Sequence, residues 1–342
     1  MKSHFVRLVR TGCLLIVSLV AASAFTALAP AGADSPSAVP GAGASCATAC
    51  TPPLVNKGGL VQANPTIYLI FWGPNWNATT GVASQQQVAT AVKNMVGSLN
   101  GTPYANILAQ YLGATNSAIT LGGTWQDQTV PPATVNRAAV AAEVDAAITA
   151  NPTWVAGNNS QFMVFTQAGT NVPAFASDEE PSDFCAYHDH AASSVMDRGQ
   201  LIFDLEPWFG DASFANCVGL YSNPANLVDA ETTVATHEIA EAATDPIWDT
   251  NPAWITNNAG SLYEIGDLCA YPGVAAAPVV GKVQLLWDNA SGTCTNAAGV
   301  PNGGATPEAP AALLLPLSGG LVVAGVLVAK RRRSTTTAKP AS

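Results

Sequence analysis

The pattern of apolar positions along the chain predicts both strands and helices. Strands are expected at residues 66–72, 119–125, 161–166 and 201–205, the first of which is a continuous apolar run that ends in Gly-Pro. Helices are expected where apolar residues recur every three or four positions, at 84–99, 104–112 and 136–150. The last of these is rich in alanine, the residue with the highest helix propensity. The order of these elements predicts a single mixed α+β domain.

The N-terminus has the pattern of an export signal. Residues 1–33 have three basic residues among the first ten, Lys2, Arg7 and Arg10, continue with an apolar run at 13–25, and end in Ala31-Gly32-Ala33, a small-x-small cleavage site. The sequence therefore predicts a mature start at Asp34. An uncleaved N-terminal anchor is the alternative.

A second apolar run lies near the C-terminus. Residues 311–329 are followed by four basic residues, 330–333. At a rise of 1.5 Å per residue this run is about 28 Å long, close to the thickness of the hydrocarbon core. Basic residues favour the cytoplasmic side, so we expect a transmembrane segment, a cytoplasmic tail at 330–342, and a domain at the cell surface. Whether the tail is retained or processed stays open.

Composition divides the region between these two ends. Residues 34–60 and 298–310 are rich in Ala, Pro, Ser and Gly and are predicted to be linkers. The domain at 61–297 is long enough to enclose a sizeable core. Between Asp34 and Glu308 the chain has 23 acidic residues and five basic ones, a formal charge of −18. This charge argues against a nucleic-acid partner, since binding to phosphates needs a basic surface.

The cysteine count agrees with export. Six cysteines remain after the signal is removed, and an even number in an exported chain suggests disulfides. Of the 15 connectivities that six cysteines allow, the simplest joins sequence neighbours: 46–50, 185–217 and 269–294. A zinc finger is the rival interpretation of 46–50, although no second Cys/His pair has the required spacing.

The strongest chemical signal is His-Glu-Ile-Ala-Glu at 237–241. It lies in a predicted helix that should end before Pro246, because the residue before a proline avoids helical geometry. His237 and Glu241 are four residues apart and share a helical face, so both could bind one zinc ion. Glu238 would then lie beside the open coordination position and could act as the general base, as in His-Glu-x-x-His metalloproteases. A solvated polar face is the alternative, although the flanking residues are apolar.

A second pair of carboxylates follows in an apolar string. Glu264 comes 23 positions after Glu241, a spacing similar to that of zinc peptidases that take a third, Glu ligand from a later helix. Asp267, three residues later, could belong to the metal site by accepting a hydrogen bond from the other ring nitrogen of His237 and so orienting the ring. A helix cap or a structural ion pair is the alternative for both residues.

His188 is the remaining candidate. In an extended segment His188 and His190 lie on one side, and His188 could stand at the rim of the site and donate to an oxyanion. The alternative is a histidine that serves only as a polar surface group.

These segments together resemble the Exordium-like, phosphate-induced protein family. The resemblance rests on four segments in the same order: Ile67–Gly73, Cys185–His188, Thr236–Pro246 and Glu264–Cys269. The family's Asn-Pro after the helix is Asp245-Pro246 here. The resemblance implies an exported, wall-associated protein and brings no established reaction.

Two functions are expected from these observations. The first is a membrane-tethered, zincin-like hydrolase of the peptidase type, with zinc held by His237, Glu241 and Glu264 and a peptide or polysaccharide of the cell envelope as substrate. The second is a non-catalytic envelope protein in which the same residues hold a structural metal or form a buried polar network. A closed four-ligand site would favour the second function, and an open position the first.

Overall fold

The computed structural model describes residues 54–115, 117–173, 184–195, 198–222, 226–256, 264–270, 274–276 and 282–296. The predicted signal peptide, the predicted membrane span at 311–329 and the basic tail lie outside the described residues. Among the described residues, no helix combines the length and the hydrophobicity needed to cross a membrane.

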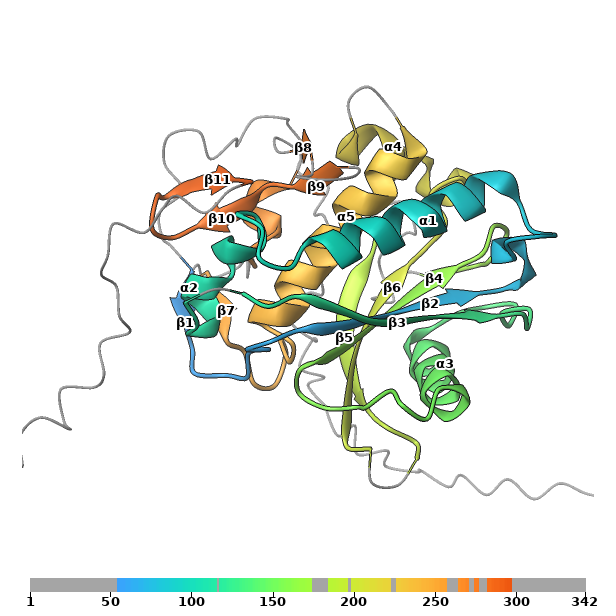
Figure 1. Cartoon of the computed structure of the whole chain (residues 1–342), viewed down its shortest axis with the longest axis horizontal. Helices are drawn as coiled ribbons and strands as arrows, with labels where there is room; N and C mark the ends of the chain where they lie inside the picture. The colour runs from blue at the N-terminus through green and yellow to red at the C-terminus, as the bar shows by residue number, and fades with distance from the viewer. Residues whose placement is uncertain are drawn as a thin grey trace, which may run out of the picture. The chain divides into compact units, whose positions relative to one another are not determined.

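A five-stranded sheet runs through the centre of the described domain (Figure 1). Its strand order is β3-β2-β4-β6-β5, in which the first four strands are parallel and β5, at one edge, is antiparallel to β6. The strands are β2 (Thr66–Trp72), β3 (Thr120–Asp127), β4 (Ser160–Thr166), β5 (Tyr187–Ala192) and β6 (Gln200–Glu206).

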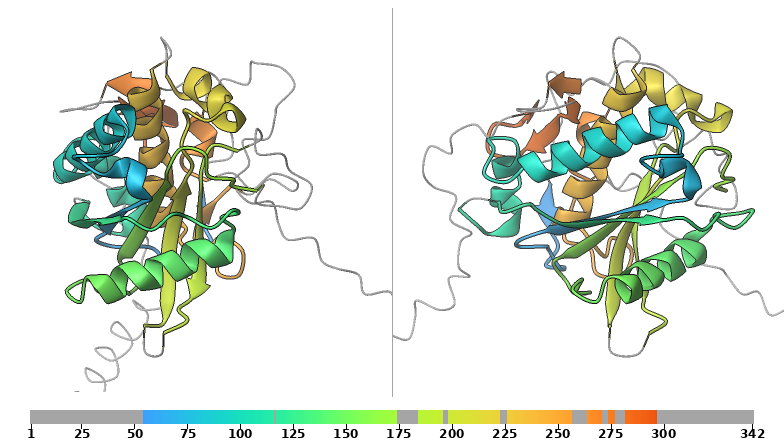
Figure 2. Two further views of the ribbon diagram at one scale, coloured as in Figure 1. Left: turned by 90° about the vertical axis from the view of Figure 1, so that its right-hand side faces the viewer. Right: turned by 45° about the vertical axis from the view of Figure 1, so that its right-hand side comes forward.

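Helices cover both faces of this sheet (Figures 1 and 2). On one face lie α1 (Ala83–Ser98) and α5 (Leu227–Thr244), and on the other lies α3 (Arg137–Ala150). Alternate residues of β2 therefore enter two different apolar clusters: Leu69 packs on the side of α1 and α5, and Ile70 on the side of α3. Burial on both faces explains why β2 reads as a continuous apolar run.

Smaller elements complete the domain. Within the described residues they form three two-stranded sheets, two short helices and four 3-10 turns: β1 (Val55–Asn56) with β7 (Trp254–Ile255), β8 (Val274–Ala276) with β9 (Lys282–Gln284), β10 (Leu286–Asp288) with β11 (Thr293–Thr295), α2 (Ala109–Leu112), α4 (Ala215–Tyr221), and turns at Pro74–Trp76, Ala105–Ile107, Ala212–Phe214 and Asp267–Cys269. Strand β9 packs directly along α5.

The predicted elements of the main sheet and of α1 and α3 are confirmed. Val88, Val92 and Met95 are fully buried on one side of α1, and Asn136 caps α3 by accepting a hydrogen bond from the Ala139 N–H. The helix expected at 104–112 is instead a 3-10 turn followed by the single turn of α2. The mixed α+β class is confirmed.

The predicted linker is too long at its C-terminal end. Residues 54–56 belong to the domain, because Leu54 is buried and β1 pairs with β7 through Val55 and Ile255. The Gly59 N–H also donates to the Pro252 carbonyl. Composition alone could not show this pairing, since the partner strand lies about 200 positions away.

Two of the three predicted disulfides are present, Cys185–Cys217 and Cys269–Cys294. The first connects the segment before β5 to α4, and the second connects the turn after Glu264 to β11. The pair 46–50 lies outside the described residues.

Candidate metal centre

Helix α5 carries the central part of the site. Its N-cap is Asn226, which accepts from the Asp229 N–H, and it ends at Thr244 before Asp245-Pro246. The helix is almost entirely buried from Ala230 onward. His237 and Glu241 share a face as expected, with His237 Nε2 3.0 Å from Glu241 Oε2.

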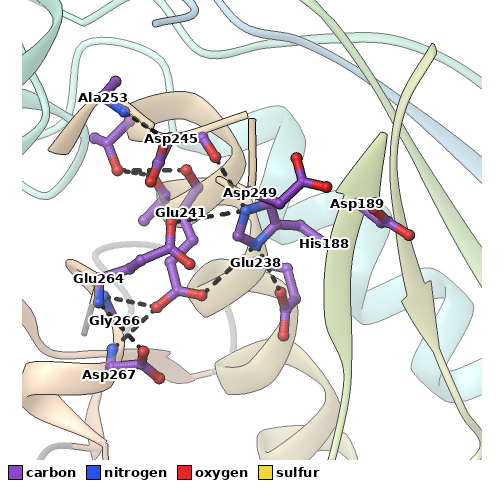
Figure 3. Close-up of polar contacts among 12 residues, drawn as sticks. His188, Asp189, Glu238, Glu241, Asp245, Asp249, Ala253, Glu264, Gly266 and Asp267 are labelled. Carbon is purple, nitrogen blue, oxygen red and sulfur yellow. Dashed lines mark hydrogen bonds and ion pairs between the residues drawn. The ribbon is translucent and has the colours of Figure 1, made fainter. Parts of the chain in front are cut away.

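The edge strand β5 brings His188 to the same place (Figure 3). His188 is paired in register with Asp204 of β6, and its side chain is fully buried. Its Nδ1 lies 3.7 Å from Glu238 Oε2 and 3.8 Å from Glu241 Oε2, and its Nε2 lies 3.7 Å from Glu264 Oε1. His188 is therefore inside the group of carboxylates and not at the rim where we expected it. The antiparallel strand turns its side chain toward α5, a placement that no local pattern encodes.

The segment 264–270 closes the site from the side opposite β5. The N–H groups of Gly266 and Asp267 donate to Glu241 Oε1 at 3.1 and 3.0 Å. The side chain of Asp267 lies with Oδ1 3.9 Å from His237 Nε2, and its Oδ2 accepts from the Glu264 N–H. One short segment thus supplies two candidate ligands and holds a third, Glu241, by its backbone.

Strand β9 contributes a residue that the sequence did not reveal. Gln284 Oε1 lies 2.9 Å from His237 Nδ1, and Gln284 Nε2 donates to the Gly266 carbonyl at 2.6 Å. The orienting contact that we expected from Asp267 is therefore made by Gln284. A glutamine in a three-residue strand carries no sequence signal of this role, and only the packing of β9 on α5 reveals it.

The candidate ligands form two sets that share Glu241. In each set, one nitrogen or oxygen of every member lies within 4.8 Å of the others: His188, Glu241 and Glu264 in one, and His237, Glu241 and Asp267 in the other. The expected set of His237, Glu241 and Glu264 is thus divided between them. Both sets fit zinc chemically, because imidazole nitrogen and carboxylate oxygen are normal zinc ligands.

Burial and charge act in opposite directions on His237. Burial lowers the pKa of His237, but Glu241, Glu238 and Asp267 raise it, so that the pKa lies well above its usual value. The carboxylates therefore favour a positive charge at this position. A divalent cation in place of the proton would be stabilised by the same groups.

More buried acids lie next to the site, where β6 meets α5. Glu206 is fully buried, and burial, followed by the charges of Glu238, Asp204 and Glu231, raises its pKa well above the usual range. Burial also raises the pKa of Glu231 to about 8, although its Oε1 accepts from the Phe209 N–H. Asp204 is held by Gln161, whose Nε2 donates to both of its oxygens. The side of the site toward β6 is thus rich in acceptors.

Comparison with known proteins adds no information on this site. No protein-family model matches the chain, and no curated protein or solved structure matches it.

Proposed function

We propose that this protein is a zinc-dependent hydrolase whose metal site is built around Glu241. The observation that carries the proposal is that Glu241 Oε2 contacts two histidines, His188 and His237, and that Glu241 also belongs to two groups of candidate ligands, with Glu264 in one and Asp267 in the other. Burying such groups together is costly unless they are paired or coordinate a metal. The ion pairs observed for Glu238, Glu241 and Glu264 are with histidine, the side chain that most often binds zinc.

The chain's own residues have distinct roles in this proposal. His237 and Glu241 bind the ion together with carboxylates of the segment 264–270. The ion supplies Lewis acidity, which lowers the pKa of water and polarises a carbonyl. Glu238 follows His237 in the chain, and its Oε2 is directed toward His188. As general base it would accept a proton from the attacking water. His188 holds the Glu238 and Glu241 carboxylates in place from the opposite side, and its Nε2 lies 3.1 Å from the Asp245 carbonyl.

We further propose that the domain acts at the cell surface, on a peptide or polysaccharide of the envelope. Support comes from the N-terminal export pattern, the apolar run at 311–329 with its basic tail, and the resemblance to the Exordium-like family. Protease added to intact cells should remove the domain and leave a small membrane fragment. Cleavage only after lysis would contradict this location.

A second candidate function is a non-catalytic envelope protein with a structural metal. The observation in its favour is burial: the side chains of His188 and Glu241 are fully buried, and those of Glu238 and His237 are 2% and 6% exposed. Structural zinc sites are closed, whereas catalytic sites keep an open position.

One experiment separates the two functions. The purified protein is measured for bound zinc and for hydrolysis of a peptide library, in the wild type and in Glu238→Gln. The hydrolase proposal expects stoichiometric zinc in both forms and a loss of hydrolysis by about 10²–10⁴-fold in the variant. Zinc in both forms without hydrolysis by the wild type would favour the structural site. A wild-type protein that binds no zinc and keeps its melting temperature in chelator would contradict both.

A further inference from the structure

The amide of Gln284 has only one orientation that satisfies both of its neighbours. The Gly266 carbonyl accepts hydrogen bonds only, so the nitrogen of the amide must face it, as observed at 2.6 Å. The oxygen of the amide then faces His237 Nδ1 at 2.9 Å. Because this oxygen is also an acceptor only, Nδ1 must carry a proton.

This contact decides which atom of His237 is available to an ion. With the proton on Nδ1, the lone pair of the neutral ring is on Nε2. Nε2 lies 3.0 Å from Glu241 Oε2 and 3.9 Å from Asp267 Oδ1. The orientation of Glu241 is fixed as well, because its Oε1 accepts from the Gly266 and Asp267 N–H groups and its Oε2 is left on the side of His237. His237 Nε2 and Glu241 Oε2 therefore face each other, on the side where Asp267 lies.

Gln284 is itself held firmly. Its side chain is 1% exposed, and its backbone N–H donates to Thr236 Oγ1 at 3.0 Å, one residue before His237. Strand β9 is thus attached to α5 next to the histidine it contacts. A residue held in this way can position its neighbour without touching a substrate.

We infer that Gln284 is a positioning residue that holds His237 with Nε2 toward the ion, and so assigns the metal to His237, Glu241 and Asp267 rather than to His188, Glu241 and Glu264. The inference rests on the metal binding of the proposed function, and it does not depend on hydrolysis. His188 then supports the site through its contacts with Glu238, Glu241 and Glu264.

The test uses the full chain with ¹⁵N-labelled histidine, of which the sequence has four. The signals of His237 are identified by their loss in His237→Ala. In the zinc-loaded wild type, NMR should show a protonated Nδ1 and a coordinated Nε2 on His237. The ring signals of His188 should shift only slightly on addition of zinc. A coordinated Nδ1 on His237, or coordination by His188 in its place, would overturn the inference.

Variants at position 284 test the positioning role. Gln284→Met removes the acceptor at similar volume and should weaken zinc binding by about 10–100-fold, the usual cost of losing such a partner. Gln284→Glu keeps an oxygen acceptor for Nδ1 but loses the donor to the Gly266 carbonyl, so it should restore part of the affinity lost in Gln284→Met, with Nε2 still coordinated. Gln85→Met removes another fully buried amide, on α1, and should leave zinc affinity unchanged.

The outcomes distinguish this inference from the proposed function. Zinc bound through Nε2 without any hydrolysis would contradict the hydrolase and leave the inference standing. Equal zinc affinity in wild type and Gln284→Met would overturn the inference and leave the metal site intact. If Gln284→Met does not fold, the NMR result on the wild type still decides, and a chain that binds no zinc overturns both.

Discussion

Gly266 lies so close to His237 that any side chain at position 266 would collide with the ring. A Cβ placed on Gly266 would be 2.6 Å from His237 Nδ1 and 2.7 Å from Glu241 Oε1. The close approach lets the Gly266 N–H reach Glu241 and its carbonyl reach Gln284. Glycine at this position is therefore required by space, not by backbone conformation.

The first prediction concerns this close approach. Gly266→Ala should displace the segment 264–270 from α5, lower the stability by about 1–3 kcal/mol as overpacking usually does, and weaken zinc binding. Urea denaturation and zinc titration are the measurements. Gly219→Ala, on α4, where a Cβ meets open space, is the matched control. A Gly266→Ala variant with wild-type zinc affinity would show that the segment does not need this contact.

The second prediction separates ligands from neighbours. His237→Ala and Glu241→Ala should each lose zinc, because both side chains are on the shared face of α5. Asp267→Asn should weaken zinc binding more than His188→Ala does, if the ion is held by the set that contains His237. Metal analysis after dialysis gives the result. A larger loss of zinc in His188→Ala than in Asp267→Asn would place the ion in the set of His188, Glu241 and Glu264.

The third prediction concerns the disulfide Cys269–Cys294. Cys269 lies two residues after Asp267, and Cys294 lies on β11, so the bond attaches the ligand segment to a neighbouring strand. Its loop should contribute about 3–4 kcal/mol in the chain-entropy model. We expect Cys269→Ser with Cys294→Ser to lose both stability and zinc affinity, as measured by thermal unfolding and zinc titration.

The control is the other disulfide. Cys185→Ser with Cys217→Ser removes a bond that closes a loop of similar length, 32 residues against 25. Cys185 is only three positions before His188, so both disulfides lie near the site. They differ in that only Cys269–Cys294 holds the segment 264–270, and the comparison tests the role of that segment. Equal losses of zinc affinity in both double variants would indicate a general effect of stability.

The fourth prediction is a pH dependence that arises away from the metal site. Burial, followed by the charge of Asp127 and a hydrogen bond with it, raises the pKa of Glu143 on α3 from 4.5 to about 8. The folded state therefore binds the proton of Glu143 more tightly than the unfolded state does. The stability that this proton contributes is complete below pH 4.5 and is lost as the pH rises to about 8. Glu143→Gln should remove this part of the pH dependence. Urea denaturation of both proteins between pH 5 and 8.5, the span in which about 80% of such a change falls, is the measurement. Parallel curves would contradict the assignment.

The sequence determined those parts of the structure that depend on neighbours along the chain. Apolar runs and four-residue spacing predicted β2, α1 and α3, since burial of one face imposes a period on the residues themselves. The same reasoning placed His237 and Glu241 on one face of α5 and ended that helix before Pro246. The disulfides 185–217 and 269–294 also followed from sequence proximity.

Only the tertiary structure decided how the candidate ligands are grouped. His188 enters the site because β5 runs antiparallel at the edge of the sheet, and Gln284 enters because β9 packs along α5. Neither contact leaves a periodic trace, since each depends on a single side chain that meets residues about 50 positions away. Spacing along the chain can therefore name residues that are able to bind a metal, but the three-dimensional packing determines which of their atoms converge.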